Sequence, residues 1–378
     1  MNFLLKSGKK CLMKNKFKVI HIIHSPCGGG AELLVRELTK RTNELGINCK
    51  AVYFNYWAEC AKTISFSNNE QSLNINYRNP FAIIALRKLF KLELIGCSSL
   101  IVHVHLTWPM FFVPLACIGL PIKLVFTQHN IVTSVRNFSF FKYFERFFYN
   151  RFNSIIAITE GVKDSLLNWL GSSIFKKITS ISNGARFFSY KERNSLGKRI
   201  KFISVGSLKH QKGFDFAIKM LSHLKDIDWH YEIVGEGSSR RELEQLIVSL
   251  GLEDKVILSG WSSKLEKKYH NADIQLIPSR FEGFGLIAIE GMSTGLPVIA
   301  SDIAGINEVV SSSVDSCFLI KDSNNIVEWL DQIKLCINTL EKDLVHISKE
   351  SYLHSQKFSL EKMTKNYIDL YRKVLKNE

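Results

Sequence analysis

The sequence is short of the features that mark secreted and disulfide-stabilised proteins. Its eight cysteines include no C-x-x-C pair, and the basic leader, residues 1–17, has too short an apolar run for a signal peptide. We therefore expect the cysteines to be reduced and mostly buried in the core of a cytoplasmic protein.

Long apolar stretches are scarce as well. Leu100–Leu120 is largely apolar, but its length is marginal for a membrane span, and it contains two histidines and two prolines. We expect a buried strand over Leu100–His105, followed by a loop and a helix. His103 and His105 alternate along this strand with no carboxylate or cysteine at a ligand spacing. We therefore interpret both as structural and expect no metal site.

Acidic residues are scarce in the first half only. Residues 1–195 carry 26 Lys and Arg against 10 Asp and Glu, whereas residues 196–378 carry 24 against 25. This asymmetry predicts an anionic partner for the first half. No nucleic-acid-binding motif accompanies the charge, so we favour an anionic membrane surface over nucleic acid. Ser134–Arg151 is rich in aromatic and basic residues, and as a helix it suits either anionic lipid or packing on the core.

A chain of 378 residues is too long for one compact core. In both halves short apolar strands alternate with amphipathic helices, which predicts α/β domains with parallel, doubly wound sheets. The polar stretch Ser189–Arg199 predicts a boundary, so we expect domains over residues 18–190 and 196–356 and a C-terminal helix within residues 357–378. The expected strands are Val19–His24, Cys49–Phe54, Leu100–His105, Lys123–Thr127, Ser154–Ile158, Lys201–Val205, Trp229–Val234, Val256–Ser259, Asp273–Ile277 and Val298–Ser301.

The most informative stretch is Ser279–Glu308. It holds Glu282 and Glu290 eight positions apart, with a glycine-bracketed turn, Gly283–Gly285, after the first glutamate. Helical spacing places Glu290 about one turn along the helix that follows the turn. A helix N-terminus beside a glycine turn favours phosphate, and carboxylates accept hydrogen bonds from sugar or ribose hydroxyls. The pattern therefore predicts a sugar-nucleotide site.

This stretch resembles the E-x7-E signature of the retaining GT-B glycosyltransferases of family 4 (glycosyl transferases group 1), and the resemblance runs from about Lys18 to the C-terminus. It implies two Rossmann-like doubly wound domains facing a cleft, with the C-terminal helix crossing back to the first domain. It also implies that Glu282 binds sugar hydroxyls, that Glu290 holds the ribose, and that the amides of Phe284, Gly285 and Leu286 face the donor phosphates. The resemblance also implies a metal-independent mechanism.

Two glycine loops also resemble phosphate-binding loops of the family. The first, Gly28–Gly30, opens a helix, and we expect Gly29 and Gly30 near the donor phosphate. In the second, Gly206–Gly213, the resemblance implies that Lys212 pairs with the diphosphate; the competing interpretation is a solvated loop lysine. Ser207 stands where the family often has an arginine, which replaces a cationic contact with a neutral donor.

Four further residues have open roles. His129 ends a strand where the family often has a histidine near the reactive sugar, so it is a catalytic candidate beside Lys212 and Glu282; a buried structural histidine is the alternative. Arg186 follows an Asn-Gly turn where the family usually has an acidic residue. Arg280 is a candidate for lining the cleft, and Glu308 is a weaker candidate for the site.

These observations predict a hexosyltransferase that takes a hexose or N-acetylhexosamine from a UDP-sugar, or a GDP-sugar, without a cofactor. The expected acceptor is a hydroxyl of a lipid-linked glycan in O-antigen, capsule or lipopolysaccharide synthesis. The enzyme would then be cytoplasmic and peripherally attached to the inner face of the cell membrane. The alternatives are a sugar-nucleotide epimerase of the same fold, a basic nucleic-acid-binding protein, and a non-catalytic partner subunit, for which Ser207 is the only hint.

Overall fold

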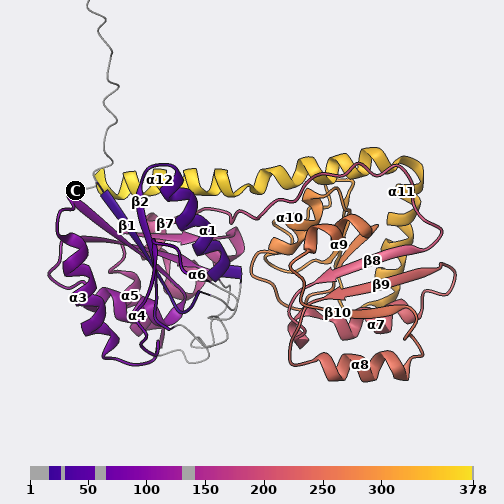
Figure 1. Cartoon of the computed structure of the whole chain (residues 1–378), viewed down its shortest axis with the longest axis horizontal. Helices are drawn as coiled ribbons and strands as arrows, with labels where there is room; N and C mark the ends of the chain where they lie inside the picture. The colour runs from indigo at the N-terminus through magenta and orange to yellow at the C-terminus, as the bar shows by residue number, and fades with distance from the viewer. Residues whose placement is uncertain (1–16, 27–29, 56–64, 130–140, 377–378) are drawn as a thin grey trace, which may run out of the picture. The chain divides into compact units, whose positions relative to one another are not determined.

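The chain folds into two compact units (Figure 1), seen in a computed structural model that describes residues 17–26, 30–55, 65–129 and 141–376. One unit comprises residues 1–127, 146–155 and 368–378, and the other comprises residues 128–145 and 156–367. The chain builds one seven-stranded and one six-stranded sheet.

The first sheet has the strand order β3-β2-β1-β4-β5-β6-β7. Its strands are β1 Phe17–Ile23, β2 Asn48–Tyr53, β3 Glu70–Ser72, β4 Ser99–His105, β5 Ile122–Gln128, β6 Ser154–Ala157 and β7 Ile178–Ser180. The accompanying helices are α1 Gly30–Glu44, α3 Ala82–Leu94, α4 Thr107–Ala116, α5 Phe141–Tyr149, α6 Glu160–Leu170 and the 3-10 turn η2 Ser172–Lys177.

The two central strands of this sheet, β1 and β4, are buried along almost their whole length. Parallel strands covered by helices on both faces read as continuous apolar runs, which is why Val19–Ile23 and Leu100–His105 show no polar alternation beyond three histidines. β1 pairs in parallel with both β2 and β4. The chain order therefore reverses between β1 and β4, as in a doubly wound sheet.

The second sheet repeats this organisation, with the order β10-β9-β8-β11-β12-β13. Its strands are β8 Ile200–Val205, β9 Trp229–Val234, β10 Val256–Gly260, β11 Ile274–Ile277, β12 Val298–Ser301 and β13 Cys317–Ile320. Its helices are η3 His210–Lys212, α7 Phe214–Ser222, α8 Arg240–Ser249, α9 Leu265–Asn271, α10 Leu286–Ser293 and α11 Ile326–Ser355, followed by η4 Gln356–Phe358 and α12 Leu360–Lys376.

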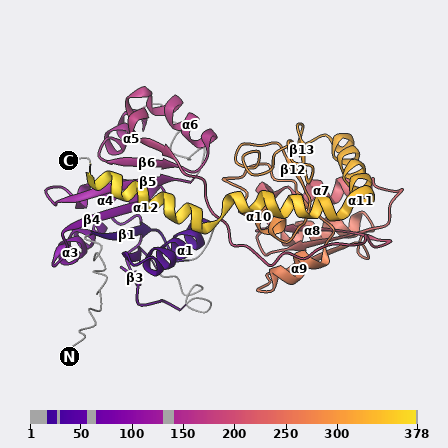
Figure 2. The same ribbon diagram turned by 90° about the horizontal axis from the view of Figure 1, so that it is seen from above.

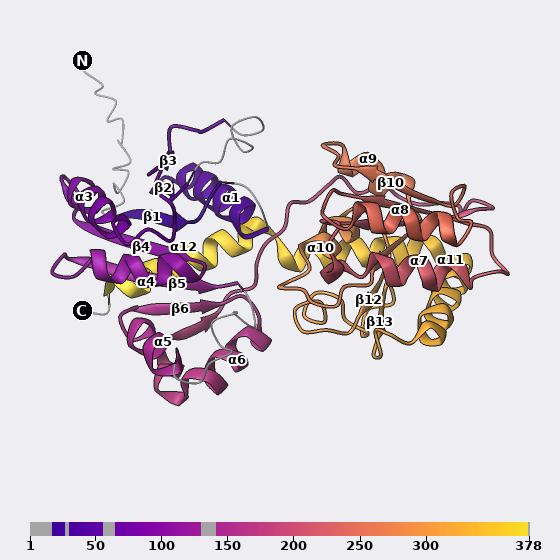
Figure 3. The same cartoon turned by 90° about the horizontal axis from the view of Figure 1, so that it is seen from below.

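Side chains alternate along β8 between two apolar clusters on opposite faces of the second sheet. Phe202 joins the larger cluster with Phe214 of α7 and Trp329 of α11, whereas Ile203 joins a smaller cluster with Tyr269 of α9. Figures 1 and 3 show the corresponding layers, with α7 and α8 on one face of the sheet and α9 and α10 on the other. Because successive side chains of a strand point to opposite faces, the side chains of β8 contribute to both apolar clusters.

The predicted strands agree with the structure to within about two residues at each end, and the doubly wound α/β fold is confirmed. The sequence patterns did not reveal β3, β7, β13, α3, α6, α9 and α11. The three strands among them all lie at sheet edges. Among the residues that the structure describes, five cysteines are free and four of these are buried, as expected. The domain boundaries at residues 190 and 196 remain predictions.

The structure adds detail to two segments that the sequence singled out. The apolar run after residue 99 forms β4 and α4, and among the residues described no helix combines the length and apolar composition of a membrane span. The described part of Ser134–Arg151 is α5, which buries Phe148 and Tyr149 in the core while Tyr143 is 76% exposed. This helix therefore packs on the protein by one face and presents aromatic rings on the other.

The C-terminal helix α12 lies within the predicted residues 357–378 and buries one apolar face. Met363, Tyr367, Leu370, Tyr371 and Val374 are all less than 10% exposed. The hydroxyl of Tyr371 lies 2.6 Å from Nδ1 of His103 on β4, so the end of this helix covers the first sheet (Figure 2). Residues from Ile368 onward accordingly group with the first unit.

Candidate functional site

The residues of the signature converge at the carboxyl edge of the second sheet. β8 pairs in parallel with both β9 and β11, so the chain order reverses between β8 and β11. The loop after β8 begins at Gly206, and the loop after β11 begins at Pro278. In open α/β sheets ligands bind outside the carboxyl ends of the strands at this reversal point. The two loops with family resemblance therefore meet where a ligand site is expected.

A close backbone approach fixes these two loops against each other. Gly213 has φ +68°, and a Cβ atom built there would lie 1.9 Å from the carbonyl oxygen of Pro278. Only glycine fits this position, because any side chain would overlap a backbone atom. The amide of Arg280 also donates to the carbonyl of Gln211 at 2.9 Å. The loop after β8, which contains Lys212, and the loop after β11, which contains the signature, thus form one rigid element.

Arg280 reinforces the same junction. Its Nη1 and Nη2 atoms each lie 2.8 Å from a carboxylate oxygen of Asp215, and Nη1 also donates to the carbonyl of His210. Burial raises the pKa of Asp215, but the paired guanidinium outweighs it and holds that pKa below its usual value. Arg280 was a candidate for lining the cleft. In the structure its guanidinium instead joins the two loops.

Lys212 and Glu282 form an ion pair across the junction. The Lys212 ammonium contacts the Glu282 carboxylate, and the two side chains are only 14% and 16% exposed. The other oxygen of Glu282 accepts from the amide of Gly283 at 3.2 Å. An ammonium has three donors, so this pair leaves Lys212 capacity for an anionic ligand. The interpretation of Lys212 as a solvated loop lysine is wrong.

The signature turn leads directly into α10. Gly285 is the N-cap with φ +76°, and Leu286 is the first helical residue, so the amides of Phe284, Gly285 and Leu286 lie at the helix N-terminus. These amides lack intrahelical acceptors, and the helix dipole adds positive potential there. Phe284 itself is 3% exposed. Its contribution to a ligand site is therefore that of its backbone.

Glu290 lies in the second turn of α10, as predicted, and is paired with Arg186. Nη2 of Arg186 lies 3.7 Å from Oε1 of Glu290, and its guanidinium lies 4.6 Å from the ring centroid of Phe188. Burial raises the pKa of Glu290 to about 7, while the positive charge of Arg186 acts in the opposite direction. The role of Arg186 could not be assigned from the sequence, because the contact joins residues about a hundred positions apart.

The remaining site candidates lie elsewhere or outside the described residues. Ser207 is exposed in the loop after β8, and Gly30 begins α1 in the first unit; Gly29 lies outside the described residues. His129 follows β5 of the first sheet and is 7% exposed, and burial lowers its pKa to about 4. Glu308 accepts from the amide of Gly161 at 3.0 Å near the start of α6.

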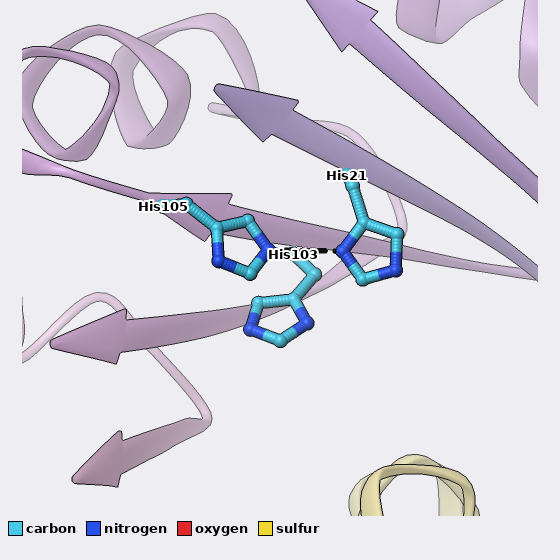
Figure 4. A group of neighbouring side chains, drawn as sticks. All are labelled: His21, His103 and His105. Carbon is cyan, nitrogen blue, oxygen red and sulfur yellow. Dashed lines mark hydrogen bonds between the residues drawn. The ribbon is translucent and has the colours of Figure 1, made fainter. Parts of the chain in front are cut away.

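Three buried histidines converge within the first sheet (Figure 4). His21 of β1 and His103 and His105 of β4 present nitrogens that all lie within 4.8 Å of one another. The sequence patterns did not single out His21, although the β1–β4 register pairs it with His103. His21 Nδ1 lies 2.9 Å from His105 Nε2, and His103 bonds the hydroxyls of Tyr371 and Thr127.

This donor set suits a neutral hydrogen-bond network better than a metal ion. Both nitrogens of His103 are already bonded to hydroxyls, those of Tyr371 and Thr127. Burial lowers the pKa of His21 to about 3, so its ring is neutral at pH 7. These contacts agree with the structural role expected for His103 and His105.

Family comparisons define the class of protein first. Residues 28–186 match the family described as Glycosyltransferase Family 4, and residues 187–353 match Glycosyl transferases group 1. Together the two matches cover most of the chain without a gap. The chain therefore belongs to the family 4, group 1 glycosyltransferases, and its two parallel-sheet units are those of the GT-B fold.

Individual relatives are distant. An uncharacterized glycosyltransferase of Methanocaldococcus jannaschii is 26% identical over 93% of this chain and 97% of its own length. The lipopolysaccharide core biosynthesis mannosyltransferase LpsB of Rhizobium meliloti is 26% identical over 49% of this chain and 56% of its own.

Solved structures share the fold. A glycosyltransferase from Rickettsia africae has a TM-score of 0.81 at 23% identity, over 96% of this chain and 100% of that one. Anabaena HepE in complex with UDP and glucose has a TM-score of 0.77 at 20% identity, over 94% of this chain and 99% of that one.

The loop junction predicts a large difference between two glycine substitutions. Gly213→Ala should lower the free energy of unfolding by about 3 kcal/mol or more, because it combines left-handed strain with overlap at Pro278. Gly251→Ala is the matched control, since Gly251 also has positive φ but has no atom within 4 Å of a built Cβ. It should cost only about 1 to 2 kcal/mol. Equal losses in urea unfolding would contradict the close approach.

The histidine network predicts a pH-dependent stability. The unfolded state takes up a proton at His21 near pH 6.5 and the folded state only near pH 3, so stability falls as pH decreases through this window. His21→Met removes this proton uptake and should reduce the slope of unfolding free energy against pH by about 1.4 kcal/mol per unit between pH 6 and 4. Urea unfolding at several pH values measures both slopes, and identical slopes would contradict the assignment.

Proposed function

We propose that this glycosyltransferase moves a hexose or N-acetylhexosamine from a nucleotide-diphosphate sugar to a hydroxyl of a glycan acceptor, with retention of anomeric configuration. A UDP-sugar is the favoured donor, with a GDP-sugar as the alternative. The observation that carries the proposal is the convergence of Lys212, Glu282 and the α10 N-terminus at the reversal point of the second sheet. HepE, which shares the fold, was solved with UDP and with UDP-glucose.

The proposed site suits a diphosphate and the sugars at its two ends. Lys212 and the amides at the start of α10 supply positive potential for the diphosphate. Glu282 would accept hydrogen bonds from sugar hydroxyls, and Glu290 from the ribose hydroxyls, because an ionised carboxylate is an acceptor only. Ser207 would add a neutral donor to this site.

The proposed reaction proceeds by attack of the acceptor on the face from which the diphosphate leaves. The bond between the anomeric carbon and the diphosphate oxygen breaks, a bond to the acceptor oxygen forms, and the acceptor proton passes to the departing phosphate. No side chain has to form a covalent intermediate. The protein lowers the barrier by stabilising negative charge on the diphosphate, which Lys212 and the α10 amides do without a metal ion.

His129 would serve this reaction as a neutral hydrogen-bonding group. Because burial lowers its pKa to about 4, the imidazole carries no charge at pH 7. A neutral ring can accept from a donor hydroxyl with one nitrogen and donate with the other. His129 would therefore orient the sugar or the acceptor rather than neutralise phosphate charge.

We further propose a lipid-linked acceptor in O-antigen, capsule or lipopolysaccharide synthesis, with the enzyme in the cytoplasm at the inner face of the membrane. Two observations support this. LpsB and the O-antigen biosynthesis glycosyltransferase WclY of Escherichia coli are relatives, although each covers only about half of the chain. All of the net positive charge also lies in the first half of the chain, since residues 196–378 carry 24 Lys and Arg against 25 Asp and Glu. This suits anionic lipid headgroups.

Nucleotide binding tests the proposed donor site. One nucleotide of a panel of UDP, GDP, ADP and CDP, with their common sugars, should stabilise the wild type by about 2.7 kcal/mol at 100 times its Kd. Glu290→Gln should lose most of this stabilisation, and Glu253→Gln, an exposed control, should keep it. Thermal shift measures both. No stabilisation of the wild type by any nucleotide would contradict the proposal.

Glu290 also predicts a pH dependence. Affinity for the sugar nucleotide should rise as Glu290 ionises near pH 7, since only the ionised form accepts from both ribose hydroxyls. Arg186→Met removes the charge that lowers this pKa, so the midpoint should move to higher pH. Arg199→Met, at an exposed ion pair, is the control. Calorimetric titrations across pH 5.5 to 8.5 should show no midpoint for Glu290→Gln; an unshifted midpoint in Arg186→Met would refute the coupling.

A further inference from the structure

Helix α3 buries one face and leaves an opposite face uncovered. Its buried residues are Ala82, Leu86, Leu89, Phe90 and Glu93. The helix packs against α4 and β4 of the first unit, and Figure 3 shows α3 and α4 side by side. The face turned away from these contacts would be polar in an ordinary surface helix.

The uncovered face is instead largely apolar. Phe81 is 70% exposed, Ile84 67%, Leu92 58% and Ile95 76%. Lys88 and Lys91 are exposed between them. At 100° per residue these six positions fall within an arc of about 100°, and they extend along about 21 Å of helix axis. We call this set of six residues the α3 stripe.

The exposed charges of the α3 stripe itself have one sign. The single acidic residue of α3, Glu93, lies on the buried face, where its carboxylate is bound by Lys18 of β1 and by Lys50 of β2 at 2.7 Å. The exposed face therefore presents two ammonium groups and no carboxylate. Long lysine stems lie along apolar surface while their charged ends reach outward, so lysines and large apolar residues occupy one face without conflict.

A neighbouring loop extends the apolar surface. Nη1 of Arg87 donates to the carbonyls of Ala116 and Ile118 at 3.0 and 2.7 Å, which fixes the end of α4 beside the middle of α3. Ile118 is 53% exposed. These two bonds of Arg87 hold the residues after α4 beside α3. Ile118 is therefore a fifth large apolar residue next to the stripe.

We propose that the α3 stripe, with Ile118, is the surface by which this enzyme docks on an anionic lipid bilayer. Apolar side chains enter the boundary between headgroups and acyl chains, and Lys88 and Lys91 reach the anionic headgroups. This inference rests on the membrane association in the proposed function and assigns it to named residues. The alternation of large apolar and basic residues along one helix face is the composition of an interfacial helix.

The charge argues against a second copy of this chain as the occupant. A symmetric contact through the stripe would place Lys88 and Lys91 of one copy against the same lysines of the other, and like charges repel. Large exposed apolar patches on soluble proteins mark binding sites for proteins or membranes. An anionic lipid surface satisfies both the apolar and the basic side chains at once.

Two double variants and two matched controls test the docking surface. Ile84→Glu/Leu92→Glu removes the apolar contact, and Lys88→Glu/Lys91→Glu reverses the charge. The controls place the same changes on exposed helix positions of the second unit, Val248→Glu/Leu335→Glu and Lys219→Glu/Lys349→Glu. Each full-length protein is sedimented with phosphatidylglycerol vesicles and with phosphatidylcholine vesicles, and circular dichroism confirms that it is folded.

We expect the wild type and both controls to bind phosphatidylglycerol vesicles, and binding to weaken with added salt as screening shortens the reach of the lysines. The lysine variant should lose about 30-fold in partition coefficient or more, since each lysine near an anionic surface contributes about fivefold. The apolar variant should lose at least tenfold. Binding equal to that of the wild type in both α3 variants would overturn the proposal, as would a wild type that does not bind phosphatidylglycerol vesicles.

A second readout separates this inference from the proposed reaction. Stabilisation by the sugar nucleotide should be the same in the wild type, in the α3 variants and in the controls, because the stripe lies outside the proposed donor site. Loss of vesicle binding with nucleotide binding intact supports the docking surface. Nucleotide stabilisation absent from every protein would refute the proposed function but not the lipid surface. A wild-type dimer that dissociates in the α3 variants during analytical ultracentrifugation would overturn the lipid proposal in favour of a self-interface.

Discussion

The contact between Gly213 and the carbonyl of Pro278 is the constraint on which the proposed donor site depends. It brings the loop after β8 against the loop after β11, two strands that pair directly although about seventy residues separate them. Once these loops meet, Lys212 and Glu282 become partners, and Arg280 can bind Asp215. A rigid pair of loops also holds the ammonium and the α10 amides in place before a ligand arrives. Preorganised positive charge stabilises a departing diphosphate more effectively than mobile side chains do.

The ion pairs at this site stabilise ionised side chains of low exposure before a ligand binds. An unpaired ammonium or carboxylate of low exposure would cost several kcal/mol. Lys212 and Glu282 neutralise each other, and Arg186 partly counters the effect of burial on the pKa of Glu290. A bound donor would then redistribute hydrogen bonds among groups that already have partners and lie in place. The same reasoning explains why Arg280, which resembles a ligand-binding cation in the sequence, acts as a structural residue.

Much of this organisation could be predicted from the sequence, and what was missed has a common cause. Short apolar runs located β1, β8 and β11, and the eight-residue spacing placed Glu290 on the helix after the glycine turn. Local patterns could not reveal the pairing of Arg186 with Glu290, nor the meeting of His21 with His103 and His105, since these contacts join distant segments. Helix α3 was missed because its exposed face is as apolar as its buried one, so it lacks helical periodicity. That same property makes it a candidate membrane surface.

In the proposed function, the carboxyl edge of the second sheet binds a nucleoside diphosphate sugar through Lys212, the α10 N-terminus and Glu290. A crystal structure of the protein with UDP would show this binding site. We predict a diphosphate within hydrogen-bond distance of the Lys212 ammonium and the amides of Gly285 and Leu286, with the ribose hydroxyls on Glu290. A nucleotide bound elsewhere, with Lys212 and Glu290 in contact only with protein groups, would contradict the claim.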